Sequence, residues 1–242
     1  MTWSIVARDP GGALGVAVAS RFFAVGALCP HARGNVGALA TQALVNPGYG
    51  PAGLDLLAQG HAPASVIERL TSADPGRAAR QVHLVDAQGR VAAHTGGDCV
   101  GWCGHIARDG CSVAGNMLAG PRVLEATADA YRDHAHLGFA ERLIAAMEAG
   151  EAAGGDKRGR QSVALRIVTT EDYPALDLRV DDHDDPLREL RRLHAKSLER
   201  FQPFVTCLPS RTNPAGVTDR AVIEREIELF QAKRAAAPGS ER

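Results

Sequence analysis

Lysine is scarce in this chain of 242 residues. Of its 27 basic residues only three are lysines, Lys157, Lys196 and Lys233, so a mechanism that needs a lysine has three candidates. An excess of charge of one sign is also missing, because the formal net charge is −1. Proteins that bind nucleic acid by neutralising phosphates depend on basic residues for affinity. The balance of charge therefore argues against a nucleic-acid partner.

Long hydrophobic runs are absent as well. The longest obvious one, Phe22 to Cys29, is much shorter than the ~18 residues that a membrane helix needs. The opening Met-Thr-Trp-Ser-Ile lacks the basic and apolar blocks of an export signal. The five cysteines are few and odd in number, which favours reduced thiols over a disulfide scaffold. We therefore expect a cytoplasmic protein with no membrane partner.

The patterns that are present alternate between strands and helices. Apolar runs bounded by turn residues predict strands at residues 2–7, 14–20, 36–42, 81–86, 91–94, 112–118, 162–169 and 176–180. Helical spacing of apolar residues predicts helices at 51–59, 63–73, 123–134, 139–149, 188–201 and 219–233. Two sheets packed face to face, with helices outside each, would bury every apolar face. The predicted fold is an α+β, four-layer αββα sandwich over residues 1–200, with a helical extension and frayed tail over 201–242.

Thr2 is the most informative single position. Methionine before a small residue is usually removed, which would leave Thr2 with a free amine beside its hydroxyl. An α-amine has an ordinary pKa of ~7.7–8.0 and can act as a base, and an adjacent amine is one known way to activate a threonine hydroxyl. The alternative is an exposed first residue without a chemical role. Ser4 follows on the same side of a strand, either as a second hydroxyl at the site or as a strand-end polar residue.

Several stretches of the sequence together resemble a known family. They are TWSIVARDP at 2–10, LGVAVASRFFAVGAL at 14–28, ALATQALVNPGYGPAGL at 38–54, GNMLAGP at 115–121, EAGEAAGGDKRGRQSVAL at 148–165 and DLRVDDHDDPLREL at 177–190. The chain is identified by them as a member of the domain-of-unknown-function 1028 family, which is found in bacteria and archaea and is usually placed with the N-terminal-nucleophile hydrolases. The resemblance covers about residues 1–195 and implies a hydrolase-like fold, without a defined substrate.

Two departures from this resemblance concern the site. Ala114 stands where many relatives are expected to have a glutamine, which argues against a direct role for that position. Proteasome-like relatives of the fold use a lysine near the nucleophile, but no lysine lies between Thr2 and Lys157. A cation that lowers the pKa of the amine would have to come from Arg21, Arg33, Lys157 or Arg158, or from His31 in their place.

Polar residues beside strand ends provide the other candidates. In the block Gly154 to Ser162, Asp156 and Arg158 could form an ion pair at a site, and arginine suits bidentate binding of a carboxylate. A solvated turn explains the same spacing equally well. Thr41, Gln42 and Asn46 end a strand, where amides can orient a substrate or stabilise an oxyanion. Alternatively these side chains satisfy the loop backbone, an explanation that suits Asn46 better than Gln42.

Two clusters raise the possibility of a metal. The acidic run 181–185 could hold a hard cation, but consecutive side chains point to alternating sides, so a solvated turn that caps the next helix is favoured. Cys99, Cys103, His105 and Cys111 lack the paired CxxC spacing of a zinc site. Cys29 near His31 is interpreted as a small core residue. We therefore expect no metal and no cofactor.

Two functional hypotheses follow. In the first, the chain is an N-terminal-nucleophile amidohydrolase that cleaves a C–N bond in a small molecule or short peptide. Its catalytic residues would be Thr2, Asp156, Arg158 and Asn116, and its substrate-binding residues Ser4, Arg21, His31, Gln42, Asn46 and Gln161. In the second, it is a non-catalytic metabolite-binding or assembly protein on the same fold. A weaker third reading is a cysteine or zinc hydrolase. In each case the Gly- and Ala-rich faces predict a homodimer or higher oligomer.

Overall fold

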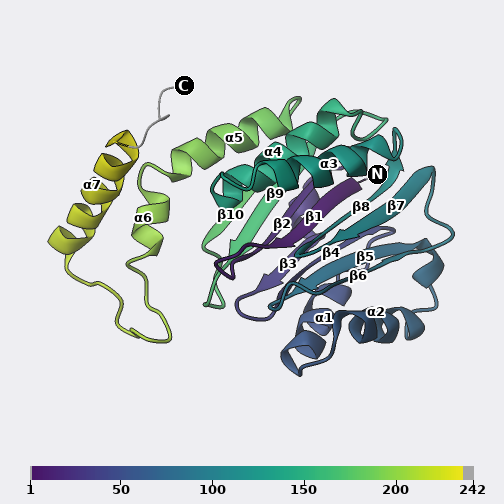
Figure 1. Ribbon diagram of the computed structural model, residues 1–242, viewed down its shortest axis with the longest axis horizontal. Coiled ribbons are helices and arrows are strands. Elements are labelled where there is room, and N and C mark those ends of the chain that lie inside the picture. The colour runs from purple at the N-terminus through teal and green to yellow at the C-terminus, as the bar shows by residue number, and fades with distance from the viewer. Residues whose placement is uncertain (1, 237–242) are drawn as a thin grey trace. The chain divides into compact units, whose positions relative to one another are not determined.

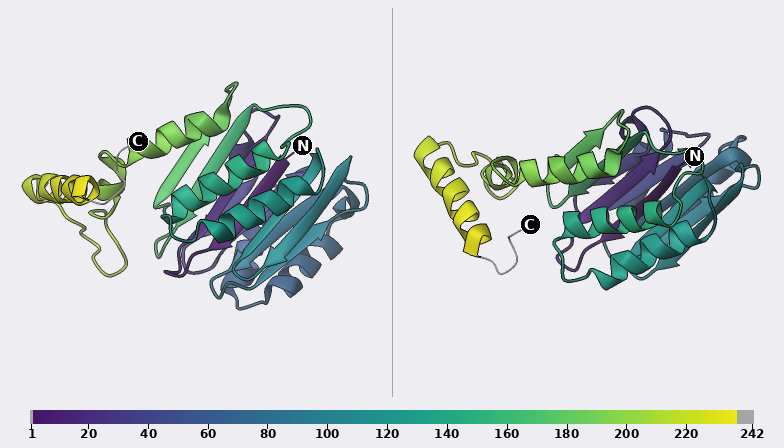
Figure 2. Two further views of the ribbon diagram at one scale, coloured as in Figure 1. Left: turned by 45° about the horizontal axis from the view of Figure 1, so that its top comes forward. Right: turned by 90° about the horizontal axis from the view of Figure 1, so that it is seen from above.

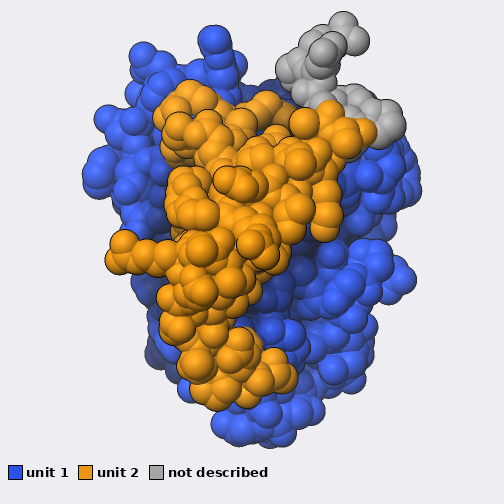
Figure 3. Space-filling view, turned by 90° about the vertical axis from the view of Figure 1, so that its left-hand side faces the viewer, with its two compact units in different colours: residues 1–190 blue, residues 191–242 orange. Residues whose placement is uncertain are grey.

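A computed structural model describes residues 2–236 of the chain (Figure 1). The chain divides into two compact units, residues 1–190 and 191–242, which are coloured separately in Figure 3. None of the helices within the described range combines the length and apolarity needed to cross a membrane. The first unit contains every strand described below and all of the site.

The first unit is built on two antiparallel sheets. The larger has the order β10-β9-β2-β1-β8-β7, and the smaller the order β3-β4-β5-β6. The strands are β1 (Thr2–Arg8), β2 (Leu14–Ser20), β3 (Pro30–Arg33), β4 (Gly37–Ala43), β5 (Arg80–Asp86), β6 (Val91–Thr95), β7 (Trp102–Arg108), β8 (Cys111–Leu118), β9 (Ser162–Val168) and β10 (Leu176–Val180). Strand β1 is therefore hydrogen-bonded on both edges, to β2 and to β8.

The inner faces of the two sheets pack against each other (Figure 2). Their contact is filled by small and β-branched side chains, including Val6, Val16, Ala38 and Val85, all fully buried. Such residues suit a pleated surface with little room between the sheets. The close packing means that any polar side chain on an inner face has to find its partners within the protein.

Two helix pairs cover the outer faces of the sheets. Helices α1 (Tyr49–Ala58) and α2 (Pro63–Ser72) lie on the smaller sheet, and α3 (Arg122–Asp133) and α4 (Phe139–Ala152) lie on the larger one. Gly15 of β2 allows the close approach of α4, because a Cβ there would come within 2.8 Å of Leu143. The architecture is thus mixed α and β with antiparallel sheets, which confirms the α+β class expected from the sequence.

The second unit is helical. Helix α5 (Pro186–Ser197) crosses the division between the units, and α6 (Phe201–Val205) and α7 (Arg220–Ala236) follow it. An ion pair between Arg200 and Glu224 joins the segment before α6 to α7. The single helix predicted over 188–201 is wrong in its extent, because α5 ends at Ser197 and α6 is a separate element. The frayed tail predicted over 235–242 begins too early, because α7 extends to Ala236. The rest of that tail, residues 237–242, lies outside the described residues.

Two strands were not predicted. Strand β3 has only four residues, and β7 lies in a segment with little alternation of apolar and polar residues. Both are outermost strands of their sheets, where one backbone edge has no strand neighbour. The hydrophobic pattern that marks a buried strand is therefore weak in both.

Candidate functional site

Thr2 lies at the start of β1, in the interior of the larger sheet. Its backbone partners are Ser20 on β2 and Asn116 on β8, and Ser20 is in turn paired with Ser162 on β9. Cross-strand partners point to the same face of a sheet, so these four polar side chains form a row across one end of it. Thr2 is only 7% exposed, and its Oγ1 lies 3.1 Å from Oγ of Ser20.

A buried network of amides lies beside Thr2, between the two sheets. Nε2 of Gln42 donates to Oε1 of Gln81 at 2.8 Å and also points to the carbonyl oxygen of Thr2 at 3.5 Å. Nδ2 of Asn116 donates to the same Oε1 at 3.0 Å. Gln81 in turn donates from Nε2 to the backbone carbonyl of Gly115 and to Thr95. The side chains of both sheets are thereby fixed next to the Thr2 backbone.

The orientation of the Gln42 amide is set by a directional chain of hydrogen bonds. Oγ of Ser4 donates to Oε1 of Gln42 at 2.6 Å, so the single Ser4 proton is used and Ser4 must accept from Nε2 of His83 at 2.8 Å. His83 therefore carries its proton on Nε2, and its Nδ1 accepts from Ser112 at 3.0 Å. Burial of the whole ring lowers the pKa of His83 to about 3, so the imidazole is neutral.

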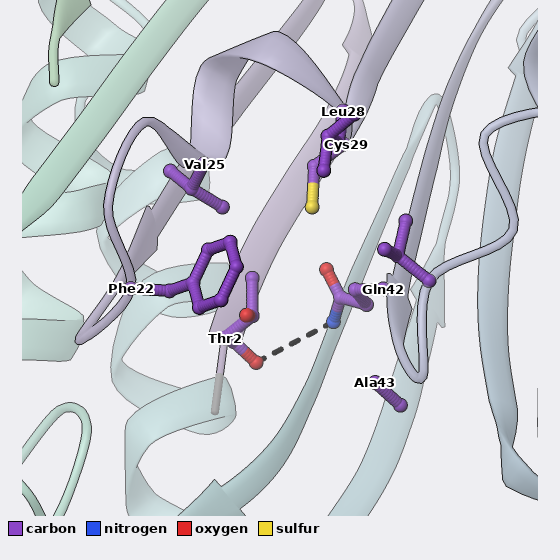
Figure 4. A pocket seen from close by; sticks show the side chains of 8 residues that line it. Thr2, Phe22, Val25, Leu28, Cys29, Gln42 and Ala43 are labelled. Atoms are coloured by element: carbon purple, nitrogen blue, oxygen red, sulfur yellow. Dashed lines mark hydrogen bonds between the residues drawn. The ribbon is translucent and has the colours of Figure 1, made fainter.

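A small cavity opens on the side chain of Thr2 (Figure 4). Its volume is about 80 Å³. The side chains that line it are those of Thr2, Phe22, Val25, Leu28, Cys29, Gln42, Ala43 and Val45. Phe22 and Cys29 point inward toward Thr2, and the amide nitrogen of Gln42 faces the Thr2 backbone. Phe22 is 56% exposed, so the cavity has an apolar rim in contact with solvent.

Asp156 and Ser162 hold the loop that forms one wall of this cavity. Oδ2 of Asp156 accepts from the backbone nitrogen of Arg21 at 2.9 Å. Oγ of Ser162 donates to the carbonyl of Phe22 and accepts from the backbone nitrogen of Val25 at 3.2 Å. One buried carboxylate and one buried hydroxyl thus fix the loop at three backbone positions.

Residues with left-handed backbone conformation gather around the same site. Ala43 has φ 68° and follows Gln42, and Met117 has φ 52° and follows Asn116. Ala24, with φ 53°, lies in the cavity loop. This conformation is unfavourable for residues other than glycine and is concentrated at functional sites. Three of the four such residues within the described range therefore lie next to side chains that surround Thr2.

The structure brings together many of the predicted site residues. Thr2, Ser4, Gln42 and Asn116 share the buried region between the sheets. Asp156 pairs with Arg158 at 3.1 Å and holds the Arg21 backbone, while the Arg21 side chain donates to the carbonyl of Arg160. Asp156 and Arg158 therefore form the ion pair that their spacing suggested.

Three other predicted residues lie elsewhere. His31 lines a separate cavity of about 460 Å³ with Arg33 and Arg166, and burial lowers its pKa, so it does not supply a cation at neutral pH. Asn46 donates to Asp74 and accepts from the backbone of Gly48, which is the loop-capping alternative. Gln161 donates to the exposed Asp182. These bonds give a structural account of Asn46 and Gln161.

The cysteines do not gather into a metal site. Within residues 2–236, no three His, Cys, Asp or Glu side chains are arranged to hold a metal ion. His105 bonds to Thr95, and Cys99 points to the carbonyl of Arg80. Burial raises the pKa of Cys111 to about 11 and that of Cys29 to about 12, so both remain protonated thiols.

Four residues of the site were not singled out from the sequence. They are Ser20, Gln81, His83 and Ser112. The available signal was a polar side chain within an otherwise apolar strand, since a buried polar group needs a partner. That signal marks the residues one by one, but it does not say which of them meet.

The chain was compared with protein families and with solved structures. The family described as a family of unknown function, DUF1028, matches residues 2–190. The crystal structure of protein SPO2555 from Silicibacter pomeroyi, which carries the same family description, is 32% identical with a TM-score of 0.84, over 90% of this chain and 96% of that chain. Anbu (ancestral beta-subunit) from Yersinia bercovieri aligns at 11% identity with a TM-score of 0.38, over 81% and 94% of the two chains.

No curated protein matches the sequence. The family match nevertheless spans more than half of the chain, and the similarity to the Silicibacter pomeroyi structure covers nearly all of both proteins. The residues of the site all lie within the matched range. This chain belongs to the DUF1028 family.

Proposed function

We propose that the protein is an N-terminal-nucleophile amidohydrolase with Thr2 as the nucleophile once Met1 has been removed. The observation that carries the proposal is the placement of Thr2, whose side chain faces a cavity from the end of a strand paired on both edges. The helix pairs outside the two sheets support the finer fold proposal, a four-layer αββα sandwich of the kind found in such hydrolases.

The proposed reaction uses the Thr2 α-amine as base. The amine accepts the Oγ1 proton while Oγ1 forms a bond to the substrate carbonyl carbon, and the carbonyl electrons move onto its oxygen. Collapse of this intermediate breaks the C–N bond, and the amine returns the proton to the departing nitrogen. Water then attacks the carbonyl carbon of the ester on Thr2 while the amine accepts a proton from the water. Collapse of this intermediate breaks the bond to Oγ1, the amine returns the proton to Oγ1, and the carboxylic acid leaves.

The amides beside Thr2 would stabilise the oxyanion. Nδ2 of Asn116 carries two hydrogens and gives one to Gln81, so the second suits a role toward a bound substrate. Such donors are effective when they are fixed before the reaction, and Gln81 is itself held by backbone carbonyls of the larger sheet. Asp156 acts as a positioning residue through the loop that it holds.

The first test is the intact mass of the purified protein, because a retained Met1 removes the free Thr2 amine. The second compares hydrolysis of a panel of amides and short peptides by the wild type, Thr2→Ala and Thr2→Ser. We expect Thr2→Ala to abolish turnover and Thr2→Ser to retain part of it, since the serine preserves the adjacent amine and hydroxyl. Cys103→Ser is the matched control and should keep full activity.

Two outcomes would overturn the proposal. Full activity of Thr2→Ala with loss in Cys103→Ser would transfer the chemistry to the cysteines. A wild-type protein that has lost Met1 but hydrolyses no member of the panel would favour the alternative, a non-catalytic binding protein on the same fold.

A further inference from the structure

The cavity beside Thr2 is apolar and uncharged. Six of its eight lining residues are Phe22, Val25, Leu28, Cys29, Ala43 and Val45, and the other two are Thr2 and Gln42. None of the side chains of these described lining residues carries a charge, since burial keeps the Cys29 thiol protonated; the α-amine that the proposed function requires on Thr2 belongs to the backbone. A charged substrate group placed among these side chains would lose its hydration without gaining a charged side chain as its partner. The lining therefore favours an aliphatic group.

The volume of the cavity restricts that group further. An apolar cavity of about 150 Å³ holds a benzene ring, whereas this one measures about 80 Å³. A branched chain of three or four carbons suits this space, and an aromatic ring exceeds it. The cavity is thus of a size to distinguish short aliphatic chains from longer ones.

The walls are held in place before any ligand enters. Ser162 bonds to the backbone at Phe22 and Val25, and the backbone nitrogen of Cys29 donates to the carbonyl of Val25. Gly26 is packed so closely on β9 that a Cβ would lie 2.5 Å from the Cβ of Ala164. The carbonyl of Cys29 accepts from Thr41 on the other sheet. Because a rigid wall does not adjust to a larger ligand, ligands of different size bind with different affinity.

We propose that this cavity binds the side chain next to the scissile carbonyl, so that the substrates are amides or short peptides with a short, uncharged, branched aliphatic group at that position. Cys29 and Val25 set the depth of the pocket. The catalytic part of this statement rests on the proposed function, whereas the binding part can be measured without turnover.

The test measures the binding of isovaleramide to the full chain by NMR titration. The matched ligand is succinamate, which has a similar length but ends in a carboxylate. We expect isovaleramide to bind both the wild type and Thr2→Ala, and succinamate to bind at least tenfold more weakly. Cys29→Leu fills the pocket and should weaken isovaleramide at least tenfold, while the control Cys103→Leu should leave its affinity unchanged.

A second variant keeps the test decisive if Cys29→Leu does not fold. Val25→Ala enlarges the pocket and should shift the preference at least threefold toward the longer 4-methylpentanamide. Equal binding of succinamate and isovaleramide, or an unchanged affinity in a folded Cys29→Leu protein, would overturn the pocket assignment. Binding by Thr2→Ala without hydrolysis by the wild type would instead overturn the proposed function and leave the pocket assignment standing.

Discussion

His83 shows what a single residue contributes to the site. Its ring is fully buried between the hydroxyls of Ser4 and Ser112, and both nitrogens are used. A proton added to Nδ1 would break the bond from Ser112 and place a charge away from water. Neutral His83 is therefore a condition for the orientation of the Gln42 amide described above.

This condition predicts a pH-dependent stability. The pKa of His83 is about 3 in the folded protein, below the ordinary value near 6.5, so between these values the unfolded chain binds more protons. The unfolding free energy should therefore fall as the pH drops from 6 to 4. His83→Gln should reduce that slope by up to about 1.4 kcal/mol per pH unit, measured by urea unfolding at pH 4, 5 and 6.

The control for this prediction is His136→Gln, which changes an exposed histidine. It should retain the wild-type slope. Equal slopes for wild type and His83→Gln would contradict the assignment of a low pKa to the buried ring.

Some of the residues of this site could be predicted from the sequence. Thr2 was identified from its place after a removable methionine, Gln42 from its place at a strand end, and Asn116 as an oxyanion donor within the stretch 115–121 that resembles the family. The structure places all three around Gln81 or the cavity. Gln81 and His83 were missed because their role depends on β5 facing β1 and β8 across the sheets. That contact joins residues far apart in the chain, so no pattern of neighbouring residues in the sequence predicts it.

Among the elements, β4 ends in a strained residue. Ala43 has φ 68° at the last position of the strand, where glycine would have no steric cost. Ala43→Gly should raise the unfolding free energy by about 0.5–1 kcal/mol, because the strain exceeds the added freedom of the unfolded chain. The measurement is urea unfolding at pH 7.

Ala38→Gly on the same strand is the matched control. Ala38 is fully buried in the contact between the sheets, so removal of its methyl group should lower the unfolding free energy by about 1–2 kcal/mol. If both variants shift stability in the same direction, the left-handed conformation of Ala43 is not a source of strain.

Helix α1 approaches β3 through a glycine. A Cβ on Gly50 would lie 2.2 Å from the ring of His31, so Gly50→Ala forces the imidazole out of position. We expect a loss of about 1–2 kcal/mol despite the better helix propensity of alanine. Gly97→Ala, where a Cβ meets no atom within 4 Å, should change the unfolding free energy by less than about 0.5 kcal/mol. Thermal and urea unfolding of the two variants provide the comparison.

The elements themselves were more predictable than their contacts. Strands β2 and β10 have the predicted bounds, and the four helices of the first unit lie where apolar spacing placed them, within a few residues. These segments bury one face, so burial determines the spacing of the apolar residues along their sequence. Strand β10 is an edge strand too, but it begins and ends with the buried Leu176 and Val180. Strand β3 buries only its first residue and β7 buries none, and this explains why these two were missed.

For the whole molecule, the distribution of exposed apolar side chains predicts self-association. The second unit exposes the large side chains of Phe201, Phe204, Val222 and Leu229. The first unit, which is more than three times as long, exposes five, namely Phe22, Phe23, Leu28, Leu44 and Val100. Exposed large apolar side chains are therefore more frequent in the second unit, and apolar surface of this kind is typical of protein interfaces. We expect the full chain to be a dimer or higher oligomer at micromolar concentration, and a chain that ends at residue 200 to be monomeric, as measured by light scattering.

The shortened chain should still fold, because the sheets, the cavity and the buried network all lie within residues 2–190. Circular dichroism and binding of isovaleramide provide the check. A monomeric full-length chain would contradict the prediction of self-association, and a dimer at both lengths would move the interface to the first unit.

The double pairing of β1 also fixes the order of events during biosynthesis. An aminopeptidase has to draw the first residues into its own active site in extended form, which is impossible once Thr2 and Trp3 are bonded to β2 and β8. Strand β8 begins at Cys111, so it leaves the ribosome roughly 5–20 s after β1 at about 5–20 residues per second. The excision of Met1 that the proposed function requires has to fall within that interval. Chains produced faster than the aminopeptidase can act would fold with Met1 in place and keep it for the lifetime of the protein.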